Sequence, residues 1–114
     1  MLIASFANSR IKEIRALRLR KERLRTGRFF SEGIRLTVEA SRRQGLVELL
    51  VIAPELLREG KGTAVAEDLV AQGVTTLEVS AEVFESLAGK DNPQGIGFVA
   101  RTQYVDFGSL APAG

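Results

Sequence analysis

The residues best able to do chemistry in this sequence are cations, and they are concentrated near its beginning. Residues 10–28 contain nine Lys and Arg but two Glu, a charge of +7, whereas residues 29–114 contain seven cations and twelve acids, a charge of −5. Seven of the nine cations are Arg, whose planar guanidinium suits two-point contact with phosphate and stacking on bases. This density of positive charge indicates a polyanionic partner, with nucleic acid as the leading candidate. The alternative is a solvated helix whose cations keep the protein soluble.

The absence of cysteine and histidine limits the other chemistry open to this sequence. Thiol nucleophiles, disulfides, imidazole bases and the usual zinc ligand sets are excluded. No serine lies in a G-x-S-x-G nucleophile elbow, and no G-x-G-x-x-G dinucleotide motif follows a predicted strand. The run Gly60-Lys61-Gly62-Thr63 lacks the upstream glycine of a phosphate-binding loop, so we interpret it as a flexible turn. We predict no catalytic, cofactor-binding or metal-binding residue in this chain.

The segment that carries the basic cluster has the spacing of a helix. Apolar residues recur at three-residue intervals from Ile11 to Leu17, after Asn8 or Ser9, either of which is a good N-cap. The pattern predicts one amphipathic helix over residues 9–23.

The rest of the sequence alternates between short apolar runs and amphipathic segments, separated by polar and glycine-containing turns. This alternation predicts an α/β fold, a three-layer α-β-α sandwich with a mixed four-stranded sheet. The phenylalanines of these elements, Phe29, Phe30, Phe84 and Phe98, are assigned to the core. Helices are expected at 34–44, 64–72 and 81–89, with a helical turn at Pro54, and strands at 28–31, 47–52, 74–79 and 95–101.

The length and composition fit one domain. The chain has 114 residues, 45% of them hydrophobic, which suffices for one core but not for two domains of ordinary size. We assign this domain to residues 1–103 and interpret residues 104–114, rich in Gly, Ala and Pro, as a linker toward a further domain. A disordered terminus is the alternative. No apolar run is long enough to span a membrane and no secretory signal is present, so we expect a soluble, cytoplasmic protein.

Three motifs, in this order and spacing, resemble the N-terminal substrate-binding domain of the SpoU/TrmH family of RNA 2′-O-ribose methyltransferases. They are S-x-x-N-x-x-I-K-x-I-R-x-L at residues 5–17, R-K-x-R-x-x-x-G-x-F-x-x-E-G-x-R at 20–35, and N-P-Q-G-I at 92–96. The resemblance covers residues 5–102 and implies a sandwich similar to ribosomal proteins that bind RNA bends. It also implies a separate C-terminal domain that binds S-adenosylmethionine, supplies the catalytic residues and forms a homodimer. The motifs of that domain are not in this sequence, so we expect no cofactor in this chain and no methyl transfer by it alone.

The resemblance and the charge pattern together give a set of expected RNA-binding residues. Most would contact phosphates, whereas two polar residues have structural alternatives: Asn8 as a helix cap, and Gln94 as a turn residue that could reach a base edge or a ribose 2′-hydroxyl. Glu32 is interpreted as a partner of an Arg or a cap of the following helix. The expected set is Asn8, Lys12, Arg15, Arg20, Lys21, Arg23, Arg35 and Gln94.

Three functions are compatible with these observations. The first is the substrate-recognition domain of an RNA 2′-O-ribose methyltransferase, which would hold RNA, most directly ribosomal RNA, through phosphates and with little sequence readout. The second is a free-standing RNA-binding protein similar to ribosomal proteins and without enzymatic activity. The third is a structural or dimerising domain whose basic segment is incidental.

Overall fold

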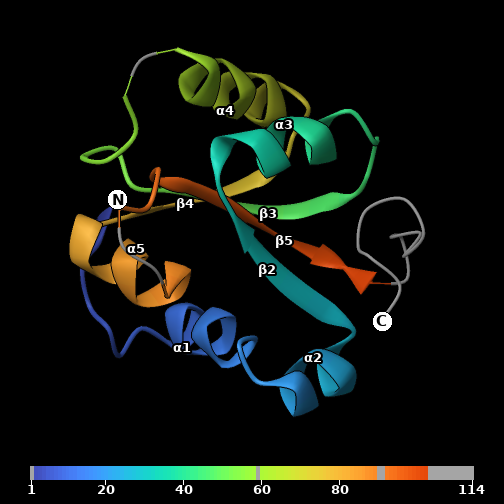
Figure 1. The fold of residues 1–114 in the computed structure, drawn as a ribbon, viewed down its shortest axis with the longest axis vertical. Helices are drawn as coiled ribbons and strands as arrows, with labels where there is room; N and C mark the ends of the chain where they lie inside the picture. The colour runs from blue at the N-terminus through green and yellow to red at the C-terminus, as the bar shows by residue number, and fades with distance from the viewer. Residues whose placement is uncertain (1, 59, 90–91, 103–114) are drawn as a thin grey trace.

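A five-stranded mixed sheet separates two layers of helices (Figure 1). The computed structural model describes residues 2–58, 60–89 and 92–102. The strand order is β1-β4-β3-β5-β2; β1, β4 and β3 are parallel, and β5 is antiparallel to both β3 and β2. The strands are β1 Leu2–Ile3, β2 Arg28–Glu32, β3 Val47–Ile52, β4 Thr75–Val79 and β5 Ile96–Arg101.

Helices α1 and α5 cover one face of the sheet, α3 and α4 cover the other, and α2 lies beside the edge strand β2 (Figure 1). The predicted three-layer α/β architecture is therefore confirmed. Among the described residues, no helix is long and apolar enough to cross a membrane. The helices are α1 Ser9–Ala16, α2 Arg20–Thr26, α3 Ile34–Ser41, α4 Lys61–Ala71 and α5 Ala81–Ala88.

Each face of the sheet has its own hydrophobic core. Phe84 and Phe98 are buried on opposite faces, whereas Phe29 and Phe30 are half-buried and pack against one core each. The rings of Phe29 and Phe98 meet edge to face, with centroids 6.1 Å apart. The assignment of all four phenylalanines to the cores is confirmed.

The predicted strand count of four is wrong because it omits β1. This strand has two residues, Leu2 and Ile3, which pair with Glu78 and Val79 of β4. Two residues are too few to show a two-residue alternation of apolar and polar side chains. The strand forms because the edge of β4 is free to pair with it. That edge is created by the tertiary fold, so the local sequence does not reveal the strand.

The predicted single helix over residues 9–23 is also wrong: two helices occupy this segment. Helix α1 ends at its C-cap Leu17, and α2 begins after Leu19, whose backbone is extended at φ −87° and ψ 129°. The apolar stripe explains the break, because Leu17 is its last buried residue and α2 buries none of its own side chains. Without an apolar face to pack, nothing fixes the later turns in line with α1.

The interpretation of residues 60–63 as a flexible turn is wrong as well. Lys61 is the first residue of α4, and Gly60, at φ 130°, is its N-cap. Gly62 is buried inside the first turn against Ile34 and Leu57. The segment looked like a loop because two glycines are unusual at a helix start. Gly60 allows the positive φ of the N-cap, and the absence of a side chain at Gly62 allows the helix to pack closely.

Candidate nucleic-acid interface

The N-terminus of α1 is capped as predicted. The Oδ1 atom of Asn8 accepts hydrogen bonds from the backbone N–H groups of Arg10 and Ile11, at 2.9 and 3.3 Å. Ile11 and Ile14 are buried against the sheet and set the rotation of the helix, which leaves the side chains of Arg10 and Lys12 exposed. Asn8 therefore acts as a cap, and α1 presents two cations to solvent.

Arg15 connects α1 to its surroundings within the fold. One guanidinium nitrogen, Nη2, donates to Oγ of Ser86 on α5 at 3.1 Å, and Nη1 donates to the carbonyl of Phe6 at 3.3 Å. The guanidinium carbon also lies 5.9 Å from the centroid of the Phe6 ring. Lys12 and Arg15, both expected to contact RNA phosphates, are thus in different environments.

Helix α2 contains two further cations with structural contacts. Nη1 of Arg23 donates to the carbonyls of Leu17 and Arg18 at 2.9 and 2.7 Å, so it satisfies groups left open at the end of α1. Arg25 forms an ion pair with Glu22 at 2.7 Å, and this hydrogen-bonded contact raises the pKa of Arg25 and lowers the pKa of Glu22.

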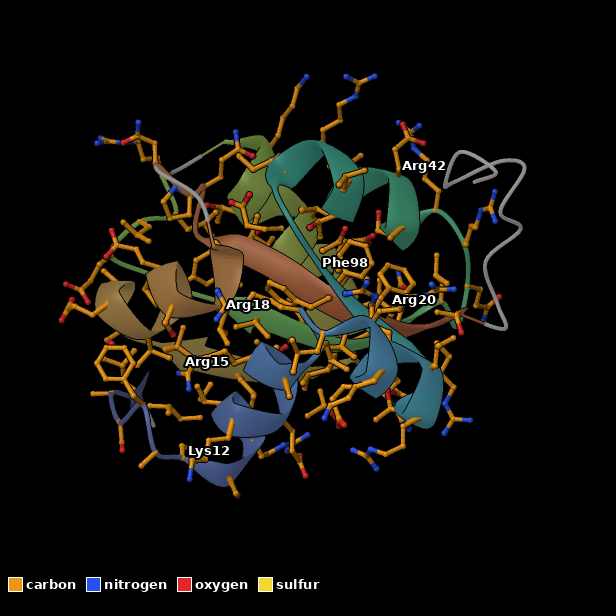
Figure 2. All side chains as sticks on the ribbon, turned by 60° about the horizontal axis from the view of Figure 1, so that its bottom comes forward. Lys12, Arg15, Arg18, Arg20, Arg42 and Phe98 are labelled. Atoms are coloured by element: carbon orange, nitrogen blue, oxygen red, sulfur yellow. The ribbon has the colours of Figure 1, made fainter. Side chains whose placement is uncertain are left out.

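The remaining cations of this segment are available for a ligand. Their side chains are exposed and make no hydrogen bond or ion pair with any part of the chain that the structure describes. Lys12, Arg18 and Arg20 are labelled in Figure 2 on the side of the molecule formed by α1 and α2. We call the set the arm cations: Arg10, Lys12, Arg18, Arg20 and Lys21.

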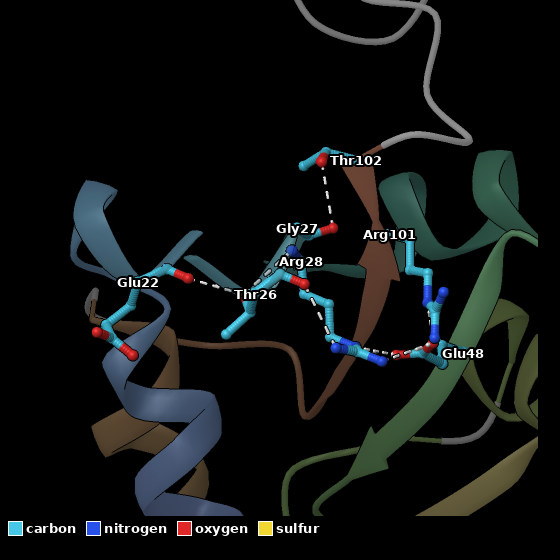
Figure 3. A network of polar contacts seen from close by, with 7 residues as sticks. All are labelled: Glu22, Thr26, Gly27, Arg28, Glu48, Arg101 and Thr102. Atoms are coloured by element: carbon cyan, nitrogen blue, oxygen red, sulfur yellow. Dashed lines mark hydrogen bonds and ion pairs between the residues drawn. The ribbon is translucent and has the colours of Figure 1, made fainter. Parts of the chain in front are cut away.

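At one end of the sheet, two other Arg residues share one carboxylate (Figure 3). Nε of Arg28 donates to Oε1 of Glu48 at 2.5 Å, and Nε of Arg101 donates to Oε2 at 2.8 Å. The hydrogen bond from Arg28, supported by that from Arg101, lowers the pKa of Glu48, and the bond to Glu48 raises the pKa of Arg28. The network joins β2, β3 and β5.

A β-bulge positions Glu48 for this network. The pairing of β3 with β5 shifts between Val47 and Leu49, so Glu48 is the extra residue of β3. Bulges re-aim the side chains next to them. The only sequence signal for the network is one acidic residue inside an otherwise apolar strand.

The start of α3 forms a second polar region. Gly33, at φ 119°, is the N-cap of α3, and Oε1 of Gln94 accepts from the N–H of Ile34 at 2.7 Å. The backbone N–H of Gln94 in turn donates to Oε2 of Glu32 at 2.5 Å. Arg35, in the first turn of α3, is exposed. The carbonyl end of Gln94 therefore serves the fold, and its amide end can donate to a ligand.

The turn before β5 brings Gln94 to this position. Asn92 and Gly95 both have positive φ, at 53° and 83°. A Cβ atom on Gly95 would lie 2.7 Å from the backbone nitrogen of Leu57, so only glycine fits there. The structural interpretation of Asn92–Gly95 as a turn is confirmed for these residues.

A groove of about 740 Å³ opens between α1, α2 and the strands β2, β3, β4 and β5. Apolar side chains of α1 and the sheet form its floor, and charged side chains form its rim. Two of the rim residues are the arm cations Arg10 and Lys12.

Comparison with known proteins gives one matching family, described as the MRM3-like substrate binding domain, whose sequence model matches residues 8–97. No curated protein sequence matches the chain significantly. A solved RNA 2′-O ribose methyltransferase is 35% identical, with a TM-score of 0.75 over 90% of this chain and 38% of that protein. An AdoMet-bound rRNA methyltransferase from Sinorhizobium meliloti is 30% identical, with a TM-score of 0.71 over 94% of this chain and 38% of the other.

A more distant structure of the TrmH family, from Porphyromonas gingivalis, is 23% identical and has a TM-score of 0.63. It covers 86% of this chain and 36% of that protein, and at this identity it supports the fold alone. The chain thus spans 36–38% of the length of these three proteins.

Proposed function

The chain belongs to the MRM3-like substrate-binding domain family, the N-terminal domain of SpoU/TrmH-type RNA methyltransferases, and on that premise we propose that it binds structured RNA. We propose ribosomal RNA as the partner, and binding to this domain positions a ribose 2′-hydroxyl for methylation by a further domain. That domain, which supplies S-adenosylmethionine binding and dimerisation, belongs to the same proposal. The binding takes place in the cytoplasm.

The arm cations are the observation that carries this proposal. All four other Arg side chains of the basic segment are held by carbonyls, a hydroxyl or carboxylates of the fold itself. The five arm cations have no such partner among the described residues, so they contribute a positive surface without a structural role. Cations of this kind bind a phosphate backbone and release its condensed counterions.

A second contact at the start of α3 extends the interface. Arg35 is exposed there, and the amide end of Gln94 can donate to a ribose hydroxyl or a base edge. Helix α2 precedes β2 and α3 follows it, so the end of α2 and the start of α3 are separated by the length of a five-residue strand, roughly 15 Å. An RNA that reaches both would run along the edge strand β2.

S-adenosylmethionine does not fit the groove of this chain. Among the charged rim residues without a partner in the described chain are two cations, Arg10 and Lys12, and one carboxylate, Glu13. The cofactor carries a sulfonium and an ammonium against one carboxylate, so its own net charge is positive and the groove would repel it. We therefore derive no methyl-transfer step from this chain.

The proposal is tested by binding of a fluorescein-labelled stem-loop RNA with an internal bulge, measured by anisotropy at several salt concentrations. If all five arm cations contact phosphates, log affinity against log salt has a slope of about −3.5 to −4.5. The double variant Arg20→Glu, Lys21→Glu should bind more than about tenfold more weakly. The matched control Arg58→Glu, Lys61→Glu changes the net charge equally on α4 and the loop before it, and should bind within about threefold of the wild type. A salt-independent affinity, or equal losses in both double variants, contradicts the proposal.

A further inference from the structure

The groove between α1, α2 and the sheet has the form of a small-molecule site. Its volume of about 740 Å³ lies within the range of about 300–1,000 Å³ that is common for such sites. Three core residues line the groove: Leu17, Leu49 and Val99, whose side chains are 7%, 7% and 4% exposed. The small exposed part of each side chain contributes apolar surface to the groove. A flat apolar group could remove this surface from water.

The rim of the groove contains one carboxylate that the fold does not use. Glu22 is paired with Arg25, and Glu48 with Arg28, so these four charges compensate one another. Glu13 lines the same groove, is exposed, and has no hydrogen bond or ion pair within the described residues. After the contacts of Glu22 and Glu48, the charge of Glu13 makes a further, smaller contribution to the raised pKa values of Arg25 and Arg28, two other residues that line this groove.

The chemistry of Glu13 and its neighbours selects among the bases. An ionised carboxylate only accepts hydrogen bonds, so it favours a base with several adjacent donors. Guanine offers N1–H and the 2-amino group side by side, and its O6 and N7 accept from Arg or Lys. Adenine and cytosine offer one amino group each, and uracil offers one N–H between two carbonyls that a carboxylate repels.

We propose that this groove binds one guanine nucleotide, unstacked from the RNA, with Glu13 as the specificity-determining residue; the inference rests on the proposed function. The base lies against the aliphatic floor, N1–H and the 2-amino group donate to Glu13, and O6 or N7 accepts from Arg10 or Lys12. These two cations belong both to the arm and to the rim, so an RNA strand held by the arm cations passes the mouth of the groove. The domain thereby reads one base in addition to the phosphates.

The experiment uses four pentaribonucleotides, UUGUU, UUAUU, UUCUU and UUUUU, titrated into the full 114-residue chain with ¹³C-labelled methyl groups. UUGUU should bind at least about fivefold more tightly than UUUUU, because a bidentate base contact discriminates at this level or above. Its largest methyl shifts should fall on Leu17, Leu49 and Val99. In the isosteric variant Glu13→Gln, UUGUU should bind more weakly because its guanine loses the carboxylate. UUUUU should bind equally or more tightly, because the substitution removes a negative charge from the protein surface that contacts phosphates. The matched control Glu67→Gln, exposed on α4 across the sheet, should keep the preference.

The other possible results separate the guanine site from the proposed function. Similar affinities for the four RNAs, shifts outside the groove, or a Glu13→Gln variant that strengthens all four equally would overturn the guanine site. If no pentanucleotide binds but the stem-loop binds with the expected salt dependence, the guanine site is again overturned and the proposed function stands. Loss of the proposed function itself would show as salt-independent or absent binding of the stem-loop.

Discussion

The arm cations and the Arg28–Glu48–Arg101 network place the same kind of side chain in opposite situations. Arg28 and Arg101 share one carboxylate, and their side chains are 35% and 43% exposed. Arg20, eight residues before Arg28, is exposed and has no partner among the described residues. The difference shows that the number of cations in a segment sets the charge of a surface, whereas packing decides which cations a ligand can use.

The strongest way to break this comparison is to remove the shared carboxylate. Glu48→Ala leaves Arg28 and Arg101 facing each other at the end of the sheet and removes hydrogen bonds that join three strands. We expect a loss of about 1–2 kcal/mol in the free energy of unfolding, discounted because the groups are about one-third exposed. Urea denaturation measures it. RNA affinity should not fall, because two cations become available.

A matched control for Glu48 is Glu39→Ala. Glu39 pairs with Arg42 at 3.3 Å on an exposed helix surface, so its removal should cost under about 0.5 kcal/mol. If both variants lose the same free energy of unfolding, the network at the sheet end is no stronger than a surface ion pair. The comparison between structurally held Arg residues and the arm cations would then fail.

Arg23 sharpens the comparison because it follows the arm cation Lys21 by two residues on α2 but has a structural contact. Arg23→Ala leaves the carbonyls of Leu17 and Arg18 without their donor, and we expect a loss of about 1 kcal/mol in stability. The salt slope of RNA binding should stay the same. Arg20→Ala should show the reverse pattern: unchanged stability, and a slope smaller in magnitude by about 0.7–0.9. A reduced slope for Arg23→Ala would mean that its guanidinium contacts phosphate in the complex.

An added acid should convert an arm cation into a paired one. Leu24 is 71% exposed and lies four residues after Arg20 on α2, so Leu24→Glu places a carboxylate one turn from that guanidinium. RNA affinity should fall about threefold, with little change in melting temperature. Val70→Glu on α4, at a position 53% exposed, adds the same charge on the opposite side of the sheet and should leave the affinity unchanged.

The sequence supports the layered fold because that information is local. Nearly continuous apolar runs mark β3 and β5, and the side chains of Asn8 and Ser80 accept backbone hydrogen bonds as helix N-caps. The division of the cations could not be predicted, because their partners are distant in the chain. Arg15 bonds to Ser86, 71 residues away, and Arg101 bonds to Glu48, 53 residues away. The cap by Arg23 is local, but it exists only because the helix breaks after Leu17.

The smallest expected effect is the response of the network to acid. The pKa of Glu48 is lowered in the folded protein, chiefly by the hydrogen bond from Arg28. The contribution of Glu48 to stability is therefore fully present above the pKa of this carboxyl in the unfolded chain, near 4.5. That contribution is lost as the pH falls through the lower folded-state pKa. Between pH 7 and pH 3 the wild type should therefore lose more stability than Glu48→Gln, by under about 1 kcal/mol because solvent screens the partly exposed pair. Urea denaturation at pH 7, 5, 4 and 3 measures the difference, with Glu67→Gln on α4 as the control. Parallel losses in wild type and Glu48→Gln would mean that Glu48 titrates as a free carboxylate, and the sheet end would then differ from the arm in geometry but not in energy.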